Sequence, residues 1–189
     1  MKLSGLTSLA APLILAGAAE AGFIGIVAVH KPNPFALTYN IYAQFDARPG
    51  DFILAVQGTA IAPLNISVID GTFYQNVFGG NKAPSAALFA VFPSLEFDTF
   101  VTIGKKTSQG DATQLAPGFP GFGPSSLAMD DSGWFITEGN SQGTPNANGQ
   151  VLLCQLSTQN GVGFTGDMLI GGFSNGVPFQ EQMCFNTVG

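Results

Sequence analysis

The sequence is short of charged side chains. Only 6 of its 189 residues are Lys or Arg and 12 are Asp or Glu, so 10% are charged, against about 25% in an ordinary soluble domain. The formal net charge is −6, and the Lys105–Lys106 pair comes closest to a basic patch. Because phosphate binding needs clustered cations, we exclude nucleic acid as a partner.

Imidazole is scarcer still, since His30 is the only histidine. A Ser or Cys nucleophile usually needs a neighbouring general base, and no G-x-S-x-G motif accompanies this one. The sequence also lacks the Lys-containing phosphate loop, 20–50-residue repeats and coiled-coil heptads. We therefore expect a single domain that is not an enzyme and holds no cofactor.

The N-terminus has the pattern of an export signal. Lys2 precedes the apolar run "LTSLAAPLILAGAA", and Ala19 and Ala21 flank Glu20 just before Gly22. This predicts a signal peptide, residues 1–21, cleaved after Ala21. The alternative is a retained membrane anchor. With cleavage, residues 22–189 form one secreted, extracellular or cell-surface domain, and the mature form does not span the membrane.

Cysteine is rare as well, with only Cys154 and Cys184. An even count in an exported chain predicts a disulfide between them. In the chain-entropy model such a bond would contribute roughly 3–4 kcal/mol. The alternative is two free thiols.

What the chain does contain is a two-residue alternation of apolar and polar side chains. In "ALTYNIYAQFD" the residues Leu37, Tyr39 and Ile41 fall on one face, and Thr38 and Asn40 on the other. This is typical of a half-buried β-strand. The Pro-Gly turn in 47–51 suggests a hairpin with a second strand over 52–61. Further strands are expected in the ranges 64–69, 95–103, 125–137, 151–159, 163–174 and 177–189.

Eight to ten short strands separated by turns predict an all-β fold, an antiparallel β-sandwich or jelly roll. The stretch "APSAALFAVFPSL" supplies at most one short helix, around 84–92, or else a buried strand. Residues 107–126, rich in Pro and Gly, form a long loop of the kind that often carries binding functions.

Glu96 and Asp98 lie two residues apart in the alternating stretch "FPSLEFDTFVTIG". A carboxylate pair is what glycoside hydrolysis needs. The same spacing places both on the wet face of a strand, which is the interpretation we adopt. A hydrolase using Glu96, Asp98 or Asp130 stays an alternative hypothesis.

Two groups of residues suggest ligand sites. Asp130 and Asp131 in "MDDSGW" could bind calcium together with Glu138, although the sequence also suits an ordinary turn. The aromatic residues Phe73, Tyr74, Phe119 and Phe122 could stack on sugars or contact proteins, or else fold back onto the sandwich. Asn65 begins the only N-x-S/T sequon.

Most of residues 35–175 resembles a family of secreted, β-rich extracellular proteins of unassigned function. The resemblance centres on "FPSLEFDTFVTIG" and includes "WFITEG", "GQVLLCQLST" and "FTGDMLIGGF". It implies export and a β-sandwich-like fold, and it brings no catalytic residues.

These observations together predict an exported structural or interaction protein. We expect a self-assembling subunit of an extracellular filament, matrix or surface layer, with itself or an extracellular glycan or protein as partner. The alternative is a carbohydrate-binding module that uses loop aromatics and calcium.

Overall fold

A computed structural model describes residues 22–46 and 48–188 of the chain, and the predicted signal peptide lies outside them. The described residues form eleven strands and three short 3-10 helices (η). Their order is β1 (Phe23–His30), β2 (Leu37–Phe45), β3 (Phe52–Gly58), β4 (Leu64–Ile69), η1 (Ala86–Leu88), η2 (Pro93–Phe97), β5 (Phe100–Val101), β6 (Gln114–Leu115), β7 (Ser126–Met129), β8 (Ser132–Phe135), η3 (Ser141–Gly143), β9 (Gln150–Thr158), β10 (Gly163–Ser174) and β11 (Val177–Asn186).

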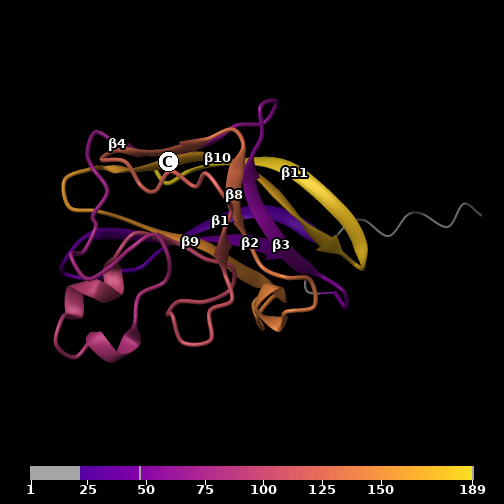
Figure 1. Cartoon of the computed structure of the whole chain (residues 1–189), viewed down its shortest axis with the longest axis horizontal. Helices are drawn as coiled ribbons and strands as arrows, with labels where there is room; N and C mark the ends of the chain where they lie inside the picture. Colours follow the sequence, from indigo (N-terminus) through magenta and orange to yellow (C-terminus); the bar gives the residue numbers. More distant parts are fainter. Residues whose placement is uncertain (1–21, 47, 189) are drawn as a thin grey trace, which may run out of the picture.

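The strands form two antiparallel sheets, which confirms the all-β fold (Figure 1). The first sheet has the order β1-β2-β9-β5. In the second, β10 pairs along one side with both β3 and β4, and on its other side with β11. β7 pairs with β4 and β8 with β3, and β6 lies beyond β8. Within the described residues no helix is long and apolar enough to cross a membrane.

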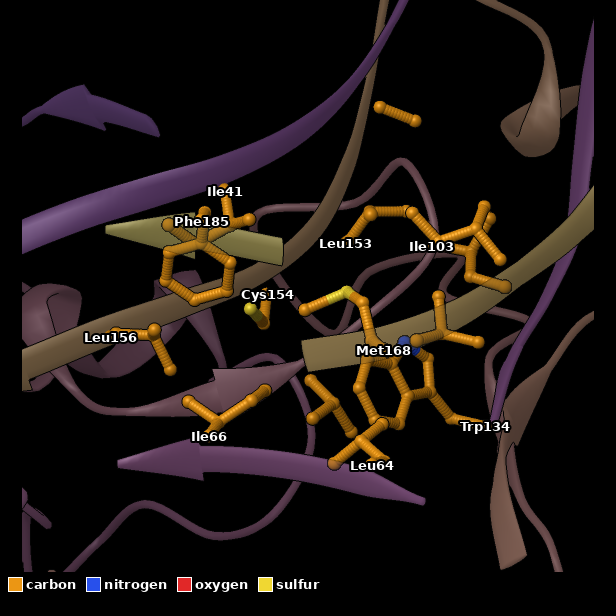
Figure 2. Packing of buried hydrophobic residues seen from close by; sticks show 14 of the residues in the cluster. Ile41, Leu64, Ile66, Ile103, Trp134, Leu153, Cys154, Leu156, Met168 and Phe185 are labelled. Atoms are coloured by element: carbon orange, nitrogen blue, oxygen red, sulfur yellow. The ribbon is translucent and has the colours of Figure 1, made fainter. Parts of the chain in front are cut away.

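A β-sandwich-like core lies between the two sheets, and Figure 2 shows its centre. Ile41 and Leu156 come from the first sheet and Ile66 and Met168 from the second, as the alternation of each strand requires. Trp134 is buried among them, and its indole N–H donates a 3.1 Å hydrogen bond to the Thr102 carbonyl. The buried Trp N–H is thereby satisfied.

The β10–β11 hairpin matches the local sequence closely. Its two-residue turn, Asn175–Gly176, has positive φ at both positions (50° and 76°), as a type I′ turn requires. Figure 1 shows β11 of this hairpin as a long, curved yellow strand. Its turn contacts the β2–β3 connection through the Gly176 N–H, which donates to the Gly50 carbonyl at 3.2 Å.

The predicted β2–β3 hairpin is wrong. β2 pairs with β1 and β9, whereas β3 pairs with β10 and β8 in the other sheet. The Pro-Gly turn reverses the chain, but which sheet receives β3 depends on partners far along the sequence. The polar face of β2 is also drier than expected, since Thr38 and Asn40 are buried.

The strand predicted over 95–103 is wrong for most of its length. Residues 93–97 form η2, and only Phe100 and Val101 pair as β5. Pro93 suits the first turn of a helix because it needs no N–H partner there. The predicted helix around 84–92 is reduced to the single turn η1 and the turns that follow it.

The predicted Cys154–Cys184 disulfide is absent, because both cysteines are free. Cys154 is fully buried on the inner face of β9 (Figure 2). Cys184 is exposed on β11, opposite the exposed Asp167 of β10. The two thiols therefore lie on opposite sides of the second sheet, and a disulfide cannot form without rearranging it.

Candidate functional site

The most exposed apolar side chains near the 3-10 helices come from two neighbouring segments, 76–80 and 86–92. Val77, Phe78, Leu88 and Val91 are 90%, 51%, 37% and 68% exposed. The two segments meet where the Phe78 and Phe92 rings lie 4.0 Å apart between centroids. We call these four exposed residues the apolar loop surface; its two segments belong to the magenta region at the lower left of Figure 1.

The buried Asp98 holds the first segment, residues 76–80, in place from the interior side. Its carboxylate accepts hydrogen bonds from the backbone N–H of Asn76 at 2.7 Å and of Gly80 at 3.1 Å. The Asn76 side-chain amide donates to the Tyr74 hydroxyl and the Ser94 hydroxyl, both at 3.0 Å. These polar contacts fix the backbone from the inside, so Val77 and Phe78 are left to face outward.

Backbone turns hold the second segment. The Phe92 N–H donates to the Leu88 carbonyl at 2.8 Å, and the Val91 N–H to the same carbonyl at 3.1 Å. Pro93 ends this turn and opens η2, in which Leu95 is fully buried. Because η1 has no buried residue, its apolar side chains project into solvent.

The apolar loop surface is almost free of charge. Lys82 is the only charged residue from 71 to 95. Its ammonium donates to the Thr113 carbonyl at 3.0 Å, which directs it toward another loop. The surface therefore combines apolar exposure with little electrostatic repulsion, a combination that typifies contact surfaces.

Asp98 is not on a wet strand face, contrary to the prediction. It is fully buried, and desolvation raises its pKa to about 6, although hydrogen bonds from Asn76 and Gly80 oppose the shift. Glu96 instead pairs with the Lys31 ammonium at 3.1 Å. The two carboxylates thus have separate structural partners, and Asp98 has no exposed surface through which to meet a substrate.

Lys31 lies against the outer side of the first sheet. Its ammonium is 4.5 Å from the Phe97 ring centroid and donates to the Gln155 side chain at 3.3 Å. Burial lowers the pKa of Lys31, while the contact with Glu96 acts in the opposite direction. The Gln155 amide in turn donates to the Asp98 carbonyl at 2.7 Å. This network joins residues 96–98, which support the apolar loop surface from the interior, to Gln155 of β9.

A second candidate site is a groove of about 420 Å³ along β3 and β8. Gln57 and Phe135 line it from the outer face of the second sheet, since Val56 and Trp134 beside them face the core. Asp131 lies at its margin. An aromatic ring beside an amide and a carboxylate is chemically suited to a sugar.

The three calcium candidates do not come together. Asp130 and Asp131 form the exposed bend between β7 and β8, whereas Glu138 follows the other end of β8. Among the described residues no three His, Cys, Asp or Glu side chains are grouped so that they could hold a metal ion. Calcium binding by this set therefore gains no support from the geometry.

Three of the four loop aromatics fold back onto the sandwich. Phe73 is buried and lies edge-to-face with Phe122, their centroids 5.1 Å apart. Phe119 packs edge-to-face on Trp134 at 6.4 Å. Only Tyr74 stays outside the hydrophobic cluster, half-buried, with its hydroxyl bonded to Asn76. The long loop 107–126 is thus part of the packed structure.

Sequence reasoning missed the residues that the structure exposes. Val77 and Phe78 stand in a stretch that has no regular alternation, and Leu88 and Val91 belong to the run interpreted as a short helix or buried strand. The sequence feature that could have indicated this surface is an uncharged run bounded by prolines at 84 and 93. The prolines limit the length of any helix or strand between them.

No protein-family model, curated protein or solved structure matches this chain. The resemblance to secreted β-rich proteins therefore stays a prediction.

Proposed function

We propose that this is an exported, non-enzymatic interaction protein that assembles with further copies of itself through the apolar loop surface. An extracellular filament, matrix or surface layer is the setting we favour. The observation that carries the proposal is the exposure of Val77, Phe78, Leu88 and Val91 on two braced segments that themselves hold no charged residue.

Burying apolar surface of this kind is favourable and lowers the free energy by about 25 cal/mol per Å². A second copy offers the same apolar and uncharged residues, so a two-fold contact would be self-complementary. The exposed Ala86, Ala87 and Ala90 would add area at the rim without steric obstruction. Self-association is therefore the simplest way to cover this surface.

The edge of the second sheet at β11 is a weaker candidate for assembly. Within the described chain β11 pairs only with β10, but it carries the exposed Pro178 and Glu181. Proline and charge are the usual protection of an edge against pairing with another strand. The apolar loop surface has no such protection.

The test is size-exclusion chromatography with light scattering over a concentration series. We expect the protein beginning at Gly22 to show a mass that rises with concentration. In the double variant Val77→Ser/Val91→Ser the association should weaken at least tenfold, about 1.4 kcal/mol. Ile61→Ser is the matched control, because Ile61 is 97% exposed in the separate β3–β4 turn. A monomer at every concentration, or equal effects of both changes, would contradict the proposal.

A second candidate function is carbohydrate binding in the β3–β8 groove. The specific observation is the presence of Phe135, Gln57 and Asp131 around one hollow. Affinity electrophoresis in gels containing soluble polysaccharides, with and without calcium, tests it. Retardation that Phe135→Ala abolishes and Tyr74→Ala leaves unchanged would support this site, and no retardation by any polysaccharide would count against it.

A further inference from the structure

Gly22 lies against two carboxylates of the β2–β3 connection. It is buried just before β1, and its carbonyl accepts the Asp46 N–H at 2.8 Å. A Cβ added to Gly22 would lie 2.7 Å from an oxygen of Asp46, and 2.7 and 2.9 Å from the two oxygens of Asp51. Any side chain at this position would therefore displace a carboxylate.

Asp51 is buried without a cationic partner among the described side chains. It is 3% exposed, and the only ion pairs between side chains in 22–46 and 48–188 are Lys31–Glu96 and Arg48–Asp46. Its oxygens accept the Arg48 N–H at 2.7 Å and the Asn175 N–H at 2.8 Å. These two bonds satisfy part of the carboxylate, but a buried charge is costly unless an opposite charge accompanies it.

The backbone nitrogen of Gly22 is placed to supply that charge. Standard bond lengths put it within about 5 Å of all three carboxylate oxygens. An opposite charge within 4–6 Å is close enough to form an effective pair. As part of a peptide bond this nitrogen is neutral, but as a free N-terminus it would be an ammonium at neutral pH.

We propose that the chain is cut between Ala21 and Gly22 and that the new Gly22 ammonium binds Asp51 and Asp46 as a buried ion pair. A leader peptidase would hydrolyse the peptide bond with one water molecule. The carboxylate stays on Ala21, and the amine of Gly22 takes up a proton. Processing would thus complete the folded domain as well as release it.

The uncut chain lacks this attraction. It carries a neutral amide at Gly22 in place of an ammonium. Among the side chains that the structure describes, the charged groups around Gly22 are Asp46, Arg48 and Asp51. The β10–β11 turn contributes the Asn175 N–H to Asp51, and the Ser174 hydroxyl accepts the Phe23 N–H at 3.0 Å. Glycine at position 22 permits this close approach.

The first test compares two proteins that differ only at the N-terminus. One begins at Gly22, released from a fusion that leaves no extra residue, and the other is the same chain acetylated on Gly22. We expect the free amine to melt about 2–4 °C higher at pH 7. The proposed ion pair would hold the pKa of the amine above its unfolded value, so the gain is complete below about pH 7.7 as long as both carboxylates are ionised, and it disappears as pH rises through the folded value.

Variants assign the effect to the two carboxylates. Asp46→Asn should reduce the difference between free and acetylated chains, and Asp51→Asn should remove most of it. Because Asp51→Asn also perturbs the turn, Asp46→Asn keeps the test decisive if that variant does not fold. The ion pair would be overturned if the free amine gave no stabilisation over the acetylated chain. It would also be overturned if that stabilisation were equally large in Asp46→Asn.

The second test addresses the cut itself. The full chain is expressed with residues 1–21 in a secreting bacterium, and the released protein is analysed by N-terminal sequencing and intact mass. We expect a protein that begins at Gly22. A released or membrane-bound protein that begins at any other residue would overturn the proposed processing.

Discussion

The Asp98 carboxylate accepts a 2.7 Å hydrogen bond from the backbone N–H of Asn76, 22 residues earlier in the chain. The same carboxylate accepts the Gly80 N–H, so one buried side chain spans both ends of the segment that carries Val77 and Phe78. A polar contact inside the molecule thus keeps apolar side chains outside it. The apolar loop surface depends on this support.

Replacing Asp98 by Asn should destabilise the protein by about 1–3 kcal/mol, because an amide offers one acceptor where the carboxylate offers two. Urea unfolding measures the change. Glu96→Gln is the control: it breaks a partly exposed ion pair with Lys31 and should cost at most about 1 kcal/mol. Equal losses in the two variants would contradict the bracing role of Asp98.

Asp98 should also make stability depend on pH. Burial raises its pKa to about 6 in the folded state, against about 3.9 unfolded. The folded state therefore holds this proton more tightly, and the contribution is complete below about pH 4 and lost as pH rises through 6. The free energy of unfolding of wild type relative to Asp98→Asn should fall between pH 4 and 6.5 and then level off. Parallel pH profiles would exclude the shift.

Adjacent glycines in the same loop should respond differently to alanine. A Cβ at Gly79 would collide with an Asp98 carboxylate oxygen, whereas a Cβ at Gly80 would meet no atom within 4 Å. We expect Gly79→Ala to cost about 1–3 kcal/mol and Gly80→Ala to stay within about 0.5 kcal/mol of wild type. Thermal unfolding of the two variants provides the comparison. Similar melting temperatures would show that the loop adapts.

The two cysteines should react as unequal free thiols. Cys184 is exposed, while burial at Cys154 raises the pKa of its thiol and removes it from solvent. A thiol reagent should label one cysteine per native chain and two after denaturation, and Cys184→Ser should leave none in the native protein. Intact mass without reductant should equal that of the dithiol. Loss of two hydrogens would show the disulfide that the structure lacks.

Local sequence was sufficient where the structure is local. The alternation of Tyr39, Ile41 and Ala43 predicted β2 and its inward face, and the limits of β10 agree with the predicted range 163–174. The turn Asn175–Gly176 closes the hairpin that follows. These features depend on side-chain periodicity and on the backbone freedom of single residues, and residues adjacent in the sequence determine both.

Contacts between distant segments decided the rest. From the sequence, Glu96 and Asp98 are predicted to lie on the solvent-facing side of a strand. In the structure the Asp98 carboxylate accepts the backbone N–H groups of Asn76 and Gly80. Glu96 pairs instead with Lys31. Likewise, an even cysteine count says nothing about which side of a sheet each thiol occupies.

The sequence by itself determined an antiparallel β protein with few charges, because periodicity and composition act residue by residue. Only the tertiary structure decided that Phe73 is buried while Val77 is exposed, and that Asp46 and Asp51 gather around Gly22. The physical reason is that burial and charge pairing depend on which segments meet in space. Those meetings are set by the packing of two whole sheets, which no short stretch of sequence encodes.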